Sequence, residues 1–178
     1  FHSLIDGHSS VSTLPSVYFS EFFEPTNWRK IISGGWGNVV EKFMMTYDVL
    51  FDANSLIPIQ SRSGVLYNIG KKEGMANLGL DKNEVFSVDR GLFKEKLNKL
   101  LSQYTDITSF DFFRLVHTAY DFSIGDSADK KILFYHIHNP SASALINFSH
   151  FSSDINWVMM IREPIQCCES WLAKPFSE

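Results

Sequence analysis

Arg162 and Ser170 are placed where they could bind an anion together. Arg162 follows the apolar run Ile155–Ile161, and Pro164 stands where the first residue of a helix is expected. If the run is a parallel strand, Arg162 lies at the carboxyl edge of a sheet, where α/β proteins bind ligands. The guanidinium and the N–H groups of the helix suit a phosphate, and Ser170, eight residues after Arg162, can add a hydroxyl. A surface arginine with an incidental serine is the alternative interpretation.

Two histidines lie two positions apart at the end of another apolar run. On a strand, residues i and i+2 share a face, so His136 and His138 could reach one metal ion. A usable site needs a third ligand, for which His150 and Asp154 are available in the sequence. This pattern raises the hypothesis of a metal-dependent hydrolase. The alternative is one buried structural histidine and one exposed histidine.

The apolar runs and the segments between them predict an α/β fold. Near-continuous apolar strands that alternate with helices are typical of a parallel sheet flanked by helices. The last third of the chain has the order strand–helix–strand–helix, over residues 131–138, 143–151, 155–161 and 164–172. We therefore expect these four segments to form the sheet and part of its cover.

The preceding two thirds of the chain are expected to be mainly helical. The segment Val11–Leu14 predicts a short strand. Apolar residues at helical spacing predict helices over residues 38–51, 89–101 and 108–120, with Asn38 and Asp89 as N-caps of the first two. Residues 54–81 contain four glycines and are predicted to be a loop.

The segment Ile155–Trp171 resembles the 3′-phosphate-binding segment of the sulfotransferase family. That family has a hydrophobic strand, then Arg, a polar residue, Pro, and a helix with a Ser eight residues after the Arg. The matching residues here are Arg162, Glu163, Pro164 and Ser170. The resemblance implies a P-loop-type α/β fold with a helical middle segment. It also implies that Arg162 and Ser170 bind the 3′-phosphate of 3′-phosphoadenosine 5′-phosphosulfate, the activated sulfate donor.

The first residues are similar to the segment that follows the 5′-phosphosulfate loop of the same family. In that segment a helix is followed by Gly/Met-His and a short stretch ending in Pro, and Gly7-His8 and Pro15 take these places here. The loop itself does not occur among the 178 residues, and Ser61–Gly64 imitates part of it in the wrong order. We expect Ser61–Gly64 to be a surface loop. Residues 1–178 are expected to form a single, incomplete sulfotransferase-like domain that is inactive by itself.

The resemblance offers two residues as the base that takes the proton of the acceptor. The segment Lys131–Pro140 resembles a family strand that ends in Lys-Thr-His-Leu-Pro, in which the His is the base. His138 takes the matching position, although positions 136, 137 and 139 depart from the pattern. In the carbohydrate sulfotransferase branch, a Glu shortly after the N-terminal Pro is the base, and Glu21 stands at about that distance. An exposed helix carboxylate is the alternative interpretation of Glu21.

Composition excludes several classes of protein. The chain has 44% hydrophobic and 20% charged residues, unlike a disordered chain or a membrane bundle, and its 16 Phe predict a thick aromatic core. A net charge of -4 argues against coating nucleic acid. No stretch approaches the roughly 20 apolar residues of a transmembrane helix. Cys167 and Cys168 are neighbours, which disfavours an ordinary disulfide, so a reducing, cytoplasmic compartment is expected.

These features together predict a sulfotransferase. It would transfer sulfonate from 3′-phosphoadenosine 5′-phosphosulfate, as a co-substrate and without a metal, to a hydroxyl of a small-molecule, carbohydrate or lipid acceptor. The identity of the acceptor cannot be read, because acceptor specificity lies in loops that have no transferable code. Two alternatives stay open: a metal-dependent hydrolase that uses His136 and His138, and a non-catalytic sulfotransferase-like binding module.

Overall fold

The computed structural model describes most of the chain. The described residues are 5, 7–14, 19, 21–51, 57–60, 66–69, 80, 81, 83, 84, 87–126, 129–137, 141–151, 155–159 and 163–172, of which 57–60, 66–69, 167 and 170–172 are described by their backbone.

The protein combines helices with short strands. The helices are α2 (Pro25–Ile32), α3 (Val39–Thr46), α4 (Arg90–Leu101), α5 (Ser109–Ser123), α6 (Ala142–Ser149) and α7 (Pro164–Leu172), with short 3-10 turns at η2 (Trp36–Asn38) and η3 (Asp48–Leu50). The strands are β1 (Val11–Thr13), β2 (Ile57–Gln60), β3 (Leu66–Ile69) and β4 (Ile132–Phe134). Within the described ranges, no helix has both the length and the apolar character needed to cross a membrane.

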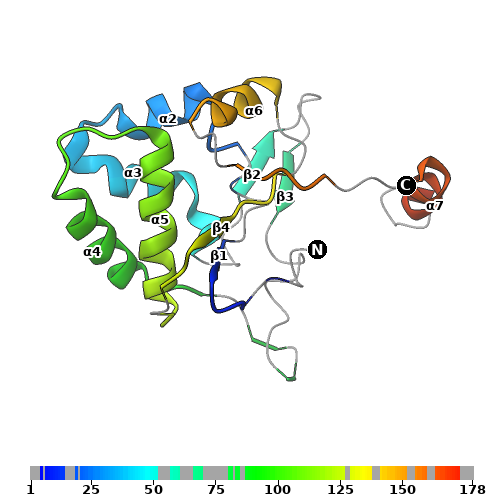
Figure 1. Ribbon diagram of the computed structural model, residues 1–178, viewed down its shortest axis with the longest axis horizontal. Coiled ribbons are helices and arrows are strands. Elements are labelled where there is room, and N and C mark those ends of the chain that lie inside the picture. Colours follow the sequence, from blue (N-terminus) through cyan, green and yellow to red (C-terminus); the bar gives the residue numbers. More distant parts are fainter. Residues whose placement is uncertain are drawn as a thin grey trace.

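A parallel pair of strands lies at the centre of the fold. β1 and β4 run in the same direction, with Val11 opposite Ile132 and Thr13 opposite Phe134. Helices α2 to α5 gather on one side of this pair, whereas α7 lies apart from the other helices (Figure 1). The mixed helix–strand character predicted from the sequence is confirmed in this coarse form.

The predicted helices form where capping residues and apolar spacing coincide. The Asp89 carboxylate accepts a hydrogen bond from the backbone N–H of Leu92 at 2.9 Å and so caps α4. The Thr108 hydroxyl accepts from the N–H of Asp111 at 3.1 Å and caps α5. The helix predicted over 38–51 ends earlier, because α3 is followed by a turn at Tyr47 and the 3-10 turn η3. Asn38 makes no side-chain capping hydrogen bond to α3.

The prediction that residues 54–81 form a loop is wrong for two segments, which form β2 and β3. β2 and β3 pair in antiparallel fashion, with Ile57 opposite Ile69 and Gln60 opposite Leu66. Both segments carry apolar residues at alternate positions, which favours strands. The glycines elsewhere in the segment masked this short pattern. Ser61–Gly64, which connects the two strands in sequence, lies outside the described residues.

The buried strand predicted over residues 155–161 does not form in its described part. Residues 155–159 are neither strand nor helix, and the side chains of Trp157, Val158 and Met159 are 55%, 67% and 83% exposed. A strand forms only when a neighbouring strand accepts its backbone hydrogen bonds, and the described β4 pairs with β1 alone. Ile132 of β4 is also exposed, although that strand was predicted to be buried.

The core is built mainly from aromatic rings. The ring centroid of Phe19 lies 4.6 Å from that of Phe22 and 5.7 Å from that of Phe113. Tyr135, directly after β4, packs edge-on against Phe113 at 5.1 Å. The completely buried phenylalanines within the described chain include Phe19, Phe22, Phe43, Phe51, Phe93 and Phe112. The predicted thick aromatic core is confirmed, and it joins the turn after β1 to α3, α4 and α5.

Replacing a central ring should cost far more stability than replacing a surface ring. Phe22→Ala is expected to lower the free energy of unfolding by about 3–5 kcal/mol, because the Phe22 ring is fully buried among other rings. Phe122→Ala is the matched control, since Phe122 is 45% exposed, and it should cost less than about 1 kcal/mol. Urea unfolding followed by circular dichroism measures both, and equal losses would contradict this account of the core.

Candidate functional site

The carboxyl ends of β1 and β4 meet at one edge of the parallel pair. Leu14 follows β1 and is buried, and Tyr135, His136 and Ile137 follow β4 and are half-buried. Ligands of α/β proteins bind at this edge because loops and helix N-termini converge there. We therefore expect the catalytic residues at this edge.

Glu21 lies in the turn over residues 21–24 beside this edge, and it is exposed. The Tyr135 hydroxyl donates a hydrogen bond of 2.8 Å to the carbonyl of Phe19, two residues before Glu21. The Asn27 amide donates at 2.8 Å to the carbonyl of Glu21 itself. These two bonds fix the turn, so the structure brings the Glu21 turn alongside the segment that leads to His138.

The charge of Glu21 acts on two neighbouring phenols. Burial, and then the negative charge of Glu21, raise the pKa of Tyr47 above its ordinary value. Burial, followed by Tyr47 and Glu21, also raises the pKa of Tyr135. Both phenols are therefore neutral at physiological pH. Glu21 thus sits as a solvent-accessible carboxylate next to two hydroxyl groups that do not ionise.

A second carboxylate occupies the N-terminus of α6. Ser141 is the N-cap of α6 and accepts from the N–H of Ala144 at 3.1 Å. Its hydroxyl donates to the Glu24 carboxylate, and the Ser143 hydroxyl donates to the same carboxylate at 2.7 Å. A negative charge is stabilised at this end of a helix. The chain's own carboxylate thus takes the place that a bound anion could otherwise occupy.

The structure describes only some of the remaining predicted site residues. His138 and Arg162 lie outside the described residues. Ser170 lies in α7, where its backbone is helical, and the helix begins at Pro164 as predicted. Glu163 and Pro164 at the start of α7 are exposed. Of the predicted site residues, Glu21 is therefore the one whose side-chain surroundings the structure describes.

The proposed histidine pair is only partly described. His136 is half-buried after β4, and His150, one suggested third ligand, is exposed after α6. His138 and Asp154 lie outside the described residues. In the part of the chain that the structure describes, no three His, Cys, Asp or Glu side chains lie close enough to share a metal ion. The two-histidine metal site remains a prediction.

A buried group of Ser, His and Asp lies between β1 and α5. The Ser12 hydroxyl lies 2.8 Å from Nδ1 of His117, and both side chains are almost completely buried. The Asp121 carboxylate, one helical turn after His117, interacts with the same hydroxyl by a side-chain hydrogen bond. A catalytic triad needs the acid on the histidine and an accessible serine, whereas here the serine stands between the other two and is closed to solvent. We assign this group to structure.

The protons of this group can be placed by elimination. Asp121 lies near Lys130 and accepts from the Ser12 hydroxyl when it is ionised. The Ser12 oxygen must then accept from Nδ1–H of His117, which leaves Nε2 as a bare acceptor. Nε2 of His117 is the buried side-chain polar atom that lacks a hydrogen-bond partner within the described chain. Burial lowers the pKa of His117 to about 3, so the ring is neutral.

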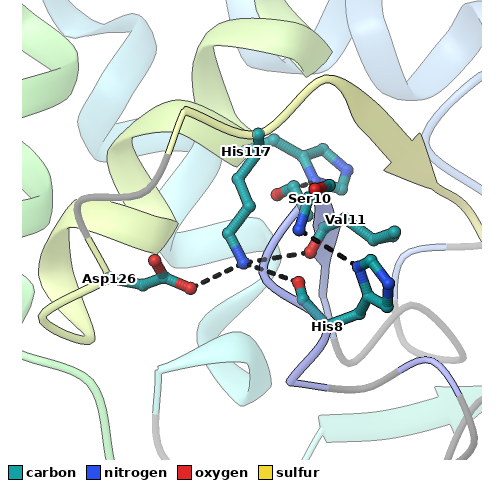
Figure 2. Close-up of polar contacts among 7 residues, drawn as sticks. His8, Ser10, Val11, His117 and Asp126 are labelled. Atoms are coloured by element: carbon teal, nitrogen blue, oxygen red, sulfur yellow. Dashed lines mark hydrogen bonds and ion pairs between the residues drawn. The ribbon is translucent and has the colours of Figure 1, made fainter.

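Lys130 ties the amino ends of β1 and β4 together. Its ammonium donates to the carbonyls of His8 and Val11, each at 3.1 Å, and forms an ion pair of 2.6 Å with Asp126 (Figure 2). The Lys130 side chain is 8% exposed, so its charge needs these three partners. This polar clamp lies at the amino end of the pair, opposite the edge that carries Glu21.

Sequence reasoning did not find the buried polar group or the clamp. His117 lies on the apolar stripe of a predicted helix, and no spacing in the sequence connects it to Ser12, 105 positions earlier. The one available signal was a polar residue within a helix face that is otherwise apolar. Such a residue indicates a buried partner but does not identify it.

The protein was compared with known proteins at three levels. No family model, no curated protein and no solved structure matches the chain.

His117 should make the protein less stable in mild acid. The unfolded histidine takes up a proton below about pH 6.5, whereas folded His117 does so near pH 3, so stability is lost as the pH falls through this window. The slope is at most about 1.4 kcal/mol per pH unit. Burial raises the pKa of Asp121, which opposes part of this slope.

His117→Asn is expected to remove this pH dependence, because the Asn amide can replace Nδ1–H but does not titrate. His150→Asn is the control, since His150 is exposed and should leave the slope unchanged. Urea unfolding measured between about pH 7 and pH 5 gives the three slopes. Identical slopes for the wild type and His117→Asn would show that His117 is not buried as a neutral ring.

Proposed function

We propose that this chain is part of a sulfotransferase with a P-loop-type α/β fold. It would transfer sulfonate from 3′-phosphoadenosine 5′-phosphosulfate to a hydroxyl of an acceptor. The observation that carries the proposal is the edge at the carboxyl ends of β1 and β4. There the Tyr135 hydroxyl donates to the carbonyl of Phe19, so the Glu21 turn lies beside the segment that follows β4. In this proposal His138, three residues after Tyr135 in the sequence, belongs to the same edge.

The start of α7 supports a donor site. α7 begins at Pro164, two residues after Arg162, and its first turn is exposed, so its backbone N–H groups are accessible to a phosphate. With a rise of about 1.5 Å per residue, Ser170 lies roughly 9 Å along the helix from Pro164. In this proposal Arg162 binds the 3′-phosphate with the helix N-terminus, and Ser170 binds it from the next turns.

The environment of Glu21 supports an acceptor site. An acceptor hydroxyl can approach Glu21 because this carboxylate is exposed. The neighbouring phenols stay protonated, so they do not compete for the acceptor proton, and the Tyr135 hydroxyl already donates its hydrogen bond to the carbonyl of Phe19. The Glu24 carboxylate already occupies the N-terminus of α6, so we do not assign the donor phosphates to that helix.

The chemistry requires one base and one in-line displacement. The acceptor oxygen forms a bond to sulfur while the bond between sulfur and the 5′-phosphate oxygen breaks, which releases adenosine 3′,5′-bisphosphate. The acceptor proton passes to His138 or Glu21. Positioning of the two substrates and stabilisation of charge on the leaving phosphate supply most of the rate, as in phosphoryl transfer.

The two alternatives are tested by separate measurements. Metal analysis of the protein purified without a histidine tag tests the hydrolase that would use His136 and His138. A protein that binds adenosine 3′,5′-bisphosphate but supports no sulfonate transfer would favour the non-catalytic module. The described residues contain no observation that favours either alternative over the sulfotransferase.

Arg162 should dominate the binding of the product nucleotide. Arg162→Ala is expected to weaken binding of adenosine 3′,5′-bisphosphate by about 2–3 kcal/mol, because it removes charged hydrogen bonds to the 3′-phosphate. Calorimetry with the intact protein measures the change. Arg114→Ala, at an exposed position of α5, is the matched control and should bind as the wild type does. Unchanged affinity in Arg162→Ala would exclude the assigned phosphate site.

The base should be identified by comparing two conservative variants. Loss of the true base is expected to lower kcat for sulfonate transfer by roughly 10²- to 10⁴-fold with little change in nucleotide affinity. Glu21→Gln and His138→Asn are assayed in the full-length enzyme, which supplies the 5′-phosphosulfate loop, with a panel of phenols and sugars as acceptors. If one variant loses turnover and the other does not, the base is assigned. If both keep full turnover, neither residue is the base.

A further inference from the structure

An open groove lies between α2, the start of α5 and the end of α6. Its volume is about 540 Å³, and it is lined by Pro25, Trp28, Arg29, Thr108, Ser109, Asn147 and Phe151. These elements lie together at one end of the helical body (Figure 1). The groove includes neither Glu21 nor any residue of α7, so it is separate from the proposed catalytic edge.

Arg29 supplies the positive charge of the groove. Its Nε donates a hydrogen bond of 3.2 Å to the carbonyl of Pro25, which aligns the side chain along the first turns of α2. The described part of the chain offers Arg29 no carboxylate within ion-pair distance. The terminal nitrogens of its guanidinium are therefore available to an anion, which they can bind with two parallel hydrogen bonds.

The first turn of α5 supplies further hydrogen-bond donors. The N–H of Asp111 is taken by the Thr108 hydroxyl, and the N–H of Phe112 by the Thr108 carbonyl. The backbone N–H groups of Ser109 and Phe110 make no hydrogen bond that the described structure contains, as is usual at a helix start. Both belong to a 15-residue helix whose dipole favours negative charge at this end.

The Ser109 hydroxyl is the second, independent indication of a ligand. Ser109 is only 3% exposed, yet its hydroxyl has no hydrogen-bond partner in the described chain. The hydroxyl oxygen is not fully enclosed by protein, so it reaches solvent. Ser109 also lines the groove. A nearly buried hydroxyl without a partner, on a residue that lines a groove, suits a bound acceptor atom.

The walls of the groove are flat and apolar. Trp28 is half-buried and packs against Phe112 at 5.2 Å, which leaves part of its ring to the groove, and Phe151 lines the groove with it. The Asn147 side-chain amide is held by a bond of 2.8 Å to the carbonyl of Phe23. The acidic residue in the first turn of α5 is Asp111, whose carboxylate accepts from the Thr108 hydroxyl at 2.8 Å.

We propose that this groove binds an organic monoanion or dianion whose charged group is attached to a flat ring. The charged group, a phosphate or sulfate monoester, contacts Arg29, the Ser109 hydroxyl and the free N–H groups of α5, while the ring packs between Trp28 and Phe151. This inference does not depend on sulfonate transfer, because it uses none of the residues assigned to that reaction.

Calorimetry with phenyl phosphate and 4-nitrophenyl sulfate tests the groove. The Arg162→Ala variant is the background throughout, so that the proposed donor phosphate site cannot account for binding. We expect saturable binding of both esters and much weaker binding of inorganic phosphate and of 4-nitrophenol, because each lacks one half of the recognised chemistry. Arg29→Gln should weaken binding at least about tenfold, and Ser109→Ala about threefold to tenfold.

Lys30→Gln is the matched control, because Lys30 is the next exposed cation on α2 but does not line the groove. Its affinity should equal that of the wild type. Amide resonances of Ser109 and Phe110 and the indole N–H resonance of Trp28 should shift as phenyl phosphate is added. Absence of saturable binding, equal losses in Arg29→Gln and Lys30→Gln, or shifts confined to other elements would overturn the proposal.

Discussion

The arrangement of the protein depends on the packing of aromatic rings around Phe19. Its ring contacts Phe22, Phe43, Phe113 and Tyr135, which come from the turn after β1, from α3, from α5 and from the end of β4. A strand of three residues cannot stabilise a parallel sheet by its backbone bonds alone. The rings hold the two short strands in place, and burial of each ring contributes far more than one hydrogen bond does.

This packing also separates the polar groups into two ends. At the amino end, Lys130 closes the strand pair, and Ser12, His117 and Asp121 satisfy one another inside the protein. At the carboxyl end, Glu21 faces solvent beside phenols that stay protonated. The polar groups at the amino end stabilise the fold, because they have no access to a ligand. The second end is accessible to substrates and carries the proposed chemistry.

Much of the helical structure could be predicted because its signals are local. Caps such as Asp89 and Thr108 and the 3.6-residue apolar spacing lie within a few residues of each helix. The strands were less predictable because they need partners elsewhere in the chain. The apolar run at 155–161 looks like a strand in isolation, yet its described residues have no neighbouring strand. For the candidate site, the sequence offered Glu21 as a base only by resemblance and did not indicate that its turn lies beside the end of β4, and the groove at Arg29 gave no sequence signal.

The pairing of β1 with β4 has a consequence for how the chain folds. The contact between Lys130 and Val11 joins positions 119 residues apart, whereas α3, α4 and α5 pack against nearby segments. Closing so long a loop costs entropy that only the completed ring packing can offset. Contacts of high sequence separation slow folding, so the helical segment between the strands should form before the sheet closes. The edge that carries Glu21 would then be the last part of the molecule to take shape.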